Sequence, residues 1–344
     1  MLRLGLIGCG THARWAVLPA VAAAGCFELA AAADVVAEHL DPIEDPNVGR
    51  YSDYRRMLAE ESLDAVFVAT PVEAHCEPTV AALKAGCGVL CEKPMARDEA
   101  ECRRMIAAAE AAGAVLVIDF ETRYAPANQQ VRQWIADGHL GRVRAIHISH
   151  LWDGHKVFGP HSERRKGFLR RSGCLDCGIH MLDIARFYCG GGRWRRVRAM
   201  GSWFGEDVPF PPHIAVAACL TPGVMVTLEA SFAYTAYIKQ QATHEAKVIV
   251  GEKGVISLER DECGRAGFRL VSETLTADFG FDHDKKGHAD VIPRVLADFA
   301  AALDGRPPSP CLATGHDGLM AQIAMDAANQ DAVRAGDTAA VTTS

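Results

Sequence analysis

The chain has 344 residues, a formal net charge of −7 and 23% charged residues. This length is enough for two domains with a sizeable core. The acidic balance argues against general binding to nucleic acid or to an anionic membrane surface. No apolar stretch is long enough to span a bilayer, and the apolar run from Leu4 stops at Gly8 without a signal-peptide layout. We therefore expect a cytoplasmic protein with no membrane or nucleic-acid partner.

The cysteines and histidines lack the spacing that is typical of a metal site. Cys174 and Cys177 form a CxxC pair, but no second pair stands at zinc-finger spacing. His150, His155 and His161 are irregularly spaced. We expect no metal site and buried, reduced thiols, which are usual for a chain without an export signal.

The first predicted strand, residues 2–7, runs into the sequence GCGTHA, after which apolar residues continue at helical spacing. This is the GxGxxA form of the dinucleotide fingerprint, with a structural glycine turn as the alternative. In this motif the glycines permit a tight turn and a close approach to a pyrophosphate, and the alanine lets the helix pack on the strand. The residues assigned to the cofactor here are Gly8, Gly10, Thr11, His12 and Ala13.

The second predicted strand, residues 27–33, ends at Asp34. An acid at this point can accept hydrogen bonds from ribose hydroxyls and would repel a 2′-phosphate. Val35 and Val36 offer no adjacent arginine, so we predict NAD in preference to NADP. A helix cap before residues 35–40 is a second role that Asp34 could fill at the same time.

Strands predicted at residues 64–69, 89–90 and 115–118 alternate with helical stretches at 54–59, 73–83 and 100–112. Such alternation predicts an α/β domain with a doubly wound parallel sheet, here residues 1–120. Ligands of these sheets bind at the carboxyl ends of the strands. Thr70–Pro71 and Glu92–Pro94 directly follow strands, so we expect them to meet the same cofactor.

Lys93 stands between an acid and a proline in the segment Cys91–Glu92–Lys93–Pro94–Met95. The proline restricts the backbone, and the segment lies at a strand end. We interpret Lys93 as an active-site residue that contacts both cofactor and substrate. A solvent-exposed lysine in a turn is the alternative.

Residues 121–344 change the pattern to strands without intervening helices, which predicts an α+β domain with an open, mostly antiparallel sheet. A helix at 126–137 precedes them, and helices at 289–303 and 316–333 are expected to pack back on the body. The predicted strands are residues 142–152, 195–204, 213–220, 225–233, 246–250, 255–259 and 268–271.

One helix, predicted over residues 174–184, interrupts these strands and carries Asp176, His180 and Asp183. Asp176 and His180 are four residues apart and so share one face. A carboxylate beside an imidazole suits a proton acceptor near neutral pH. The same spacing could hold a metal, or could be a helix cap with a satisfied histidine.

Taken together, these residues resemble the glucose–fructose oxidoreductase / inositol dehydrogenase (Gfo/Idh/MocA) family over nearly the whole chain. The resemblance rests on Gly8–Cys9–Gly10, Thr70–Pro71 with His75, Cys91–Glu92–Lys93–Pro94, Arg123–Tyr124, and the segment 173–180 with Asp183. It implies a Rossmann domain joined to an open-faced sheet, homo-oligomers (dimer or tetramer) built on that sheet, and a cis Lys93–Pro94 peptide. It also implies NAD(P)-dependent hydride transfer on sugars, cyclitols or related polyols, with His75 and Glu92 near the cofactor.

The resemblance implies that Lys93, Asp176 and His180 are catalytic and surround one pocket beside the nicotinamide. His180 would take the hydroxyl proton, Lys93 would stabilise the oxygen, and Asp176 would support the His180 charge. Further candidates for substrate contact, each with a structural alternative, are Arg123, Trp152, His155 and Lys156.

The chain departs from the family pattern at Arg171–Ser172–Gly173, where a glycine run is usual. A basic cluster, Arg164–Arg165–Lys166 and Arg170–Arg171, precedes it and could receive an anionic substrate group or be a solvated loop or subunit contact. Our main hypothesis is a dehydrogenase of a sugar, amino sugar or cyclitol. The alternatives are a nucleotide-sugar oxidoreductase and a catalytically silent protein that senses sugar and NAD.

Overall fold

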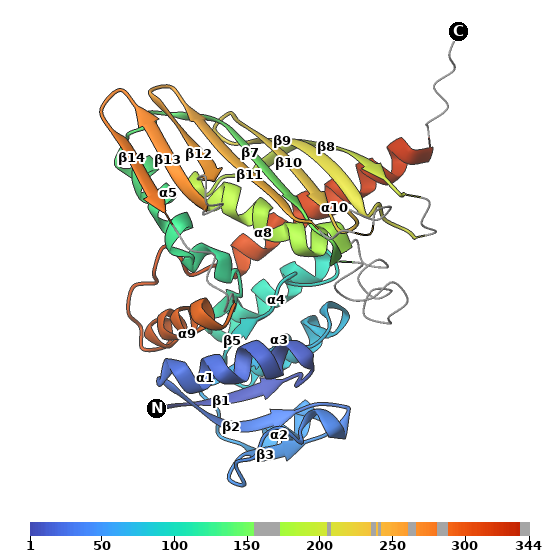
Figure 1. Ribbon diagram of the computed structural model, residues 1–344. Helices are drawn as coiled ribbons and strands as arrows, with labels where there is room; N and C mark the ends of the chain where they lie inside the picture. Colours follow the sequence, from blue (N-terminus) through green and yellow to red (C-terminus); the bar gives the residue numbers. More distant parts are fainter. Residues whose placement is uncertain are drawn as a thin grey trace. The chain divides into compact units, whose positions relative to one another are not determined.

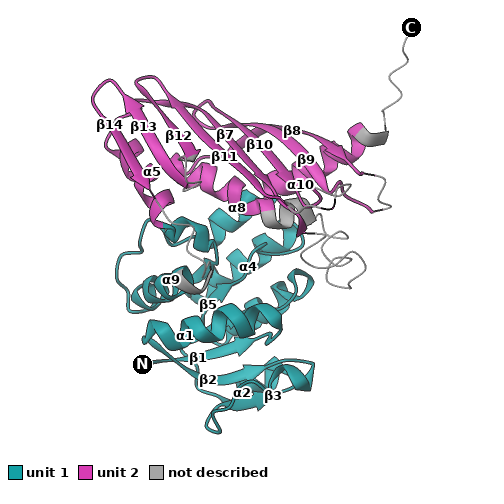
Figure 2. Cartoon of the chain, in the orientation of Figure 1, with its two compact units in different colours: residues 1–125, 284–322 teal, residues 126–283, 323–344 magenta. Residues whose placement is uncertain are grey.

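The computed structural model describes residues 1–154, 173–204, 208–234, 239, 242–260, 266–280 and 288–337. Lys156, His155 and the basic cluster at 164–171 lie outside these residues. The chain forms two compact units, residues 1–125 with 284–322 and residues 126–283 with 323–344 (Figure 2). The sequence suggested a single boundary at residue 120, whereas packing groups residues 284–322 with the first unit. The division into a cofactor-binding and a substrate-binding part stays a prediction.

The first unit is built on a six-stranded parallel sheet in the order β3-β2-β1-β4-β5-β6 (Figure 1). The predicted α/β class and parallel sheet are confirmed. The strands are β1 (Leu2–Ile7), β2 (Phe27–Ala33), β3 (Gly49–Tyr51), β4 (Ala65–Val68), β5 (Gly88–Cys91) and β6 (Leu116–Ile118). The chain turns back from β3 and re-enters the sheet on the other side of β1, at β4. This reversal is the topological switch point, where such sheets bind ligands.

Helices cover both faces of this sheet. They are the π-helical turn η1 (Ala13–Val17), α1 (Leu18–Ala24), α2 (Tyr54–Glu60), α3 (Cys76–Lys84), α4 (Glu99–Ala112) and α9 (His288–Leu303), with short turns η2 (Ala37–His39), η3 (Val72–Ala74) and η4 (Glu121–Tyr124). The late helix α9 packs on α1, and the rings of Phe27 and Phe299 stack at 5.8 Å. The prediction that this distant helix returns to the body is therefore confirmed.

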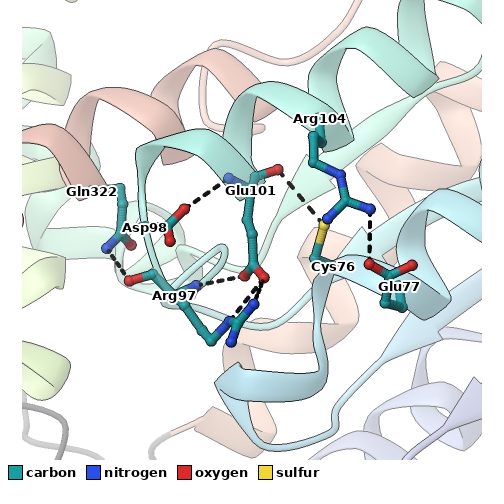
Figure 3. Close-up of polar contacts among 7 residues, drawn as sticks. All are labelled: Cys76, Glu77, Arg97, Asp98, Glu101, Arg104 and Gln322. Atoms are coloured by element: carbon teal, nitrogen blue, oxygen red, sulfur yellow. Dashed lines mark hydrogen bonds and ion pairs between the residues drawn. The ribbon is translucent and has the colours of Figure 1, made fainter.

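A set of hydrogen bonds around the buried Glu101 carboxylate, called the clasp below, fixes the segment that follows Lys93–Pro94 (Figure 3). The Glu101 carboxylate accepts hydrogen bonds from the Arg97 backbone N–H at 3.2 Å and from its Nε at 2.8 Å. Asp98 caps α4 by accepting the Glu101 N–H at 2.9 Å. Gln322, in α10 (Gly315–Asp337), donates to the Arg97 carbonyl at 3.4 Å. The clasp thus connects the end of the loop that carries Lys93 (residues 92–97, called the lysine loop below) to the start of α4.

The second unit is built on an eight-stranded sheet in the order β14-β13-β12-β11-β7-β10-β9-β8 (Figure 1). Neighbouring strands are antiparallel except β7 and β10, so the mostly antiparallel sheet is confirmed. The strands are β7 (Val143–Leu151), β8 (Trp194–Ser202), β9 (His213–Leu220), β10 (Val224–Ser231), β11 (His244–Gly251), β12 (Gly254–Arg260), β13 (Ala266–Ser272) and β14 (Thr276–Gly280).

Helices α5 (Pro126–Ala136) and α8 (Gly173–Tyr188) contact strands of this sheet. The Tyr188 hydroxyl donates to Asn128 Oδ1 at 2.6 Å, which joins the two helices inside the unit. Among the described residues, no helix combines the length and apolarity needed to cross a bilayer.

Candidate active site

A cavity of about 770 Å³ lies at the carboxyl ends of β1, β2 and β4 in the first unit. Its volume falls within the usual range for small-molecule and cofactor sites. Five of the residues predicted from sequence to bind the cofactor line it: Gly8, Gly10, Asp34, Thr70 and Pro71. The position matches the crevice that the sheet order predicts.

The two glycines of the first turn, Gly8 and Gly10, are needed for different reasons. Gly8 has φ +91°, and a Cβ there would lie 2.6 Å from the Thr70 backbone nitrogen. A Cβ on Gly10 would meet nothing within 4 Å, so Gly10 faces open space along the cavity. Ala13 is fully buried beneath the turn. This arrangement fits a dinucleotide, because the backbone can approach a pyrophosphate at Gly10 without a side chain between them.

Asp34 is held rigidly at the edge of the cavity. Its Oδ2 accepts the Cys9 backbone N–H at 2.7 Å, and its Oδ1 accepts the Val36 N–H at 2.8 Å. The ring Nδ1 of His39 lies 3.1 Å from Oδ2. Residues 35–40 contain only the short turn η2 instead of a regular helix, so Asp34 organises this turn and the glycine turn together.

The sequence did not identify three further residues that line the cavity on the β3 side, next to Asp34: Ser52, Tyr54 and Arg55. These residues follow β3, a three-residue strand with no hydrophobic pattern. The Arg55 guanidinium lies over the Tyr54 ring at 4.6 Å and 3.7 Å from Asp53. The sequence showed no arginine beside Asp34, but the fold brings Arg55 to the same cavity.

The lysine loop follows β5, and its Lys93–Pro94 peptide is cis. His75 contacts this loop and the loop after β4. Its Nδ1 lies 2.9 Å from the Pro94 carbonyl oxygen, and its Nε2 lies 2.8 Å from the Thr70 carbonyl oxygen. Burial lowers the pKa of His75 below its usual value, although the two carbonyls oppose the shift. His75 therefore positions two loops at the carboxyl edge, since both ring nitrogens contact backbone.

Glu92 links this loop to the glycine turn. Its Oε1 lies 2.8 Å from His12 Nε2, and its Oε2 accepts the Lys93 backbone N–H at 3.2 Å. Burial by itself would raise the pKa of Glu92, but His12 and Lys93 outweigh burial and hold the pKa below its usual value. Glu92 is thus a buried carboxylate whose charge is balanced by neighbours on two strand ends.

Asp119, directly after β6, was not identified from the sequence. It is 1% exposed, and its backbone N–H donates to the Cys91 carbonyl at 2.8 Å. Its position one residue past a predicted strand was the available signal, but buried acids and ordinary loop acids look alike in sequence.

The structure also describes four other residues that were predicted to belong to the site, namely Arg123, Trp152, Asp176 and His180. Arg123 is 4% exposed and lies 3.4 Å from Asp317, which favours its structural alternative. In the second unit, Trp152 packs edge-on against Phe232 at 5.5 Å. The backbones of Asp176 and His180 both lie in α8, as predicted. Within the described parts of the chain, no cluster of three or more His, Cys, Asp or Glu side chains could hold a metal ion.

Comparison with protein families decides the assignment. Residues 2–120 match the model of the oxidoreductase family with an NAD-binding Rossmann fold, GFO_IDH_MocA, and residues 128–257 match the GFO/IDH/MocA C-terminal domain. The chain belongs to the Gfo/Idh/MocA family. The resemblance inferred from the sequence motifs is confirmed.

Individual relatives are more distant. The 1,5-anhydro-D-fructose reductase of Ensifer adhaerens is 34% identical over 54% of this chain and 56% of its own length. The match therefore spans about half of that relative.

Two solved structures share the fold at lower identity. An oxidoreductase from Agrobacterium radiobacter in complex with NAD⁺, L-tartaric acid and magnesium is 19% identical, with a TM-score of 0.79 and 97% of both chains covered. A mutant of a 3-ketoreductase from Actinomadura kijaniata in complex with TDP-benzene and NADP is 22% identical, with a TM-score of 0.73 and 96% and 97% of the chains covered.

Proposed function

We propose that this protein is an NAD-dependent dehydrogenase that reversibly oxidises a secondary hydroxyl of a sugar, amino sugar or cyclitol to a ketone. The observation that carries the proposal is the Glu92–Lys93–Pro94 loop, which His75 and Glu92 hold at the carboxyl end of β5. In a doubly wound sheet a dinucleotide lies across the strand ends, with its adenosine beside β2. The cavity at Asp34 suits the adenosine half, which leaves the nicotinamide half for the side of β5 and Lys93.

NAD, when bound, supplies the hydride acceptor. The chain's own residues supply the rest: Lys93 donates a hydrogen bond to the reacting oxygen and stabilises its developing negative charge. His180 accepts the hydroxyl proton, and Asp176 supports the resulting imidazolium. In the reverse direction the same groups return the proton to the carbonyl oxygen.

The cofactor preference rests on Asp34, whose carboxylate would repel a 2′-phosphate. Arg55, which lines the same cavity, acts against that preference, because a guanidinium binds phosphate well. The distant relative from Actinomadura kijaniata has NADP in its structure. We expect NAD to be preferred while NADP retains weaker binding.

A substrate panel tests the proposal. Purified protein is mixed with NAD or NADP and with inositols, aldoses, amino sugars and nucleotide sugars, and formation of the reduced cofactor is followed by absorbance. Turnover with a free polyol supports the proposal. Turnover confined to nucleotide sugars supports the alternative oxidoreductase, and tight NAD binding without turnover on any compound supports the catalytically silent sensor.

A double-mutant cycle tests the assigned roles. Lys93→Ala and His180→Ala should each lower kcat by about a hundredfold or more, and the double variant should be little worse than the poorer single variant. Such non-additivity is expected of residues that act on one chemical step. Full additivity of the two losses would contradict a shared step.

The oligomer is proposed to form on the uncovered face of the sheet in the second unit. Pairing register places Met225, Val250, Val255 and Val271 in one row across β10, β11, β12 and β13, with Ala145 of β7 between them. The four larger side chains are 38–56% exposed. A Val271→Lys variant should weaken assembly in analytical ultracentrifugation, whereas the exposed Glu110→Gln change on α4 should not.

A further inference from the structure

Two buried carboxyl side chains follow adjacent strands at the start of the loop that carries Lys93. Glu92 follows β5 and Asp119 follows β6, the adjacent strand, and the Asp119 backbone N–H is tied to the Cys91 carbonyl. Glu92 is 8% exposed and Asp119 is 1% exposed. β5 and β6 pair Cys91 with Ile118, so Glu92 and Asp119 occupy the next neighbouring positions at the two strand ends. Two ionised carboxyls at neighbouring buried positions would repel each other and, having no donor, could not hydrogen-bond, whereas one shared proton allows them to do so.

The proton belongs on Asp119. Both Glu92 oxygens already have donors or cationic neighbours, at His12 and at the Lys93 backbone N–H. Asp119 Oδ1, in contrast, has no hydrogen-bond partner in the part of the chain that the structure describes. An unpartnered buried oxygen costs much less on a neutral carboxyl than on a carboxylate. Burial and then the charges of Glu92 and Glu121 raise the pKa of Asp119 well above its usual value.

We propose that Asp119 is a positioning residue of the active site, which shares one proton with Glu92 and so keeps Glu92 directed at His12 and at the Lys93 backbone. The pair then carries a single negative charge, which the cations around it can balance. If both carboxyls were ionised, their repulsion would turn Glu92 away and release the lysine loop. The titratable groups that act on the pair from neighbouring elements are His12, His75, Cys91, Lys93 and Glu121.

Replacing the acid by its isosteric amide separates this role from simple packing. In Asp119→Asn the amide N–H₂ can donate to Glu92 as the protonated acid does, and its oxygen can occupy the unpartnered position. In Asp119→Leu the side chain still branches at Cγ, although it is larger, and the donor is lost. The exposed Glu110→Gln change serves as the control for a neutralised acid elsewhere in the first unit.

Infrared spectroscopy of protein labelled with ¹³C-aspartate tests the shared proton without any substrate. The wild-type protein should show an isotope-shifted carboxylic-acid C=O band at neutral pH, and Asp119→Asn should lack it. The Glu110→Gln control should keep the band. Absence of the band in the wild type, or its persistence in Asp119→Asn, would overturn the proposal even if the protein proves to be a dehydrogenase.

Stability gives a second readout. An acid with a raised pKa in the folded state contributes stability below its unfolded value that is lost as the pH rises toward the folded value. The denaturation midpoint of Asp119→Asn should therefore exceed that of the wild type by a margin that grows from about pH 4 upward. A margin that does not change with pH would contradict the assignment of the proton.

The effect on turnover rests on the proposed dehydrogenase function. Asp119→Asn should keep kcat within about threefold of wild type, whereas Asp119→Leu should lose about tenfold to a hundredfold. The alkaline decline of wild-type kcat should be weaker in Asp119→Asn, since the amide cannot ionise. Equal losses in both variants would reduce Asp119 to a packing role.

Discussion

The ring of His12 and the carboxylate of Glu92 meet at 2.8 Å, from residues that follow β1 and β5. Because β4 lies between these two strands in the sheet, the contact bridges the carboxyl end of β4. Glu92 also accepts the Lys93 backbone N–H, so the glycine turn and the lysine loop form one linked unit. The proposed cofactor turn and the proposed catalytic lysine are thus held together by one buried acid.

Glu92→Gln tests this link. The amide keeps the shape but removes the negative charge that balances His12 and Lys93, so we expect a loss of about 1–3 kcal/mol of unfolding free energy at neutral pH. An acid with a lowered folded pKa contributes stability above its unfolded value, about 4.3 for Glu, that disappears as the pH falls through the folded value. The difference between variant and wild type should therefore shrink below about pH 4 in denaturant titrations. A gap that widens in acid would contradict the assignment of charge to Glu92.

Glu101 tests the clasp of Figure 3. Its carboxylate is nearly buried, and Arg97 is the main cause of its lowered pKa. Glu101→Ala leaves the Arg97 backbone N–H without this acceptor, so a loss of about 1–3 kcal/mol is expected. The matched control is Glu99→Ala, which removes an exposed ion pair with Arg103 on the same helix and should cost less than about 1 kcal/mol. Similar losses of unfolding free energy in Glu101→Ala and Glu99→Ala would show that burial of the Glu101 carboxylate adds no stability.

Asp34 tests cofactor choice. Asp34→Asn removes the charge that disfavours a 2′-phosphate while keeping an acceptor for the Cys9 N–H. We expect NADPH affinity to rise and NADH affinity to fall, each measured by fluorescence titration. Adding Arg55→Ala should reverse the gain in NADPH affinity, because it removes a guanidinium that lines the same cavity. An unchanged ratio of the two affinities in Asp34→Asn would mean that this carboxylate does not select the cofactor.

An element of this structure can be predicted from the sequence where its burial produces a run of apolar residues. Mainly apolar runs such as Leu2–Ile7 and Ala65–Val68 mark strands whose residues are mostly buried, and these were predicted. β3, with the sequence Gly-Arg-Tyr, is defined only by its pairing with β2 and was not. Because β3 was not predicted, the positions of Tyr54 and Arg55 at the cavity, which depend on that strand, were not predicted either.

The motif residues of the site follow the same logic. Gly8 and Thr70 were recognised because each directly follows a strand, and in the structure Thr70 leaves no room for a Cβ at Gly8. Asp119 also follows a strand, but nothing in its neighbours indicates that its side chain turns inward. The raised pKa of Asp119 is a property of the fold, since it arises first from burial and then from the charge of Glu92.

The central claim is that Lys93 acts in hydride transfer chemistry and not in holding the cofactor. The most direct measurement compares wild type with Lys93→Met, using NADH binding by fluorescence and single-turnover rates with the best substrate from the panel. We expect NADH affinity within about threefold of wild type and a rate lowered by about a hundredfold or more. A variant that turns over at the wild-type rate, or that loses rate only in proportion to NADH affinity, would contradict it.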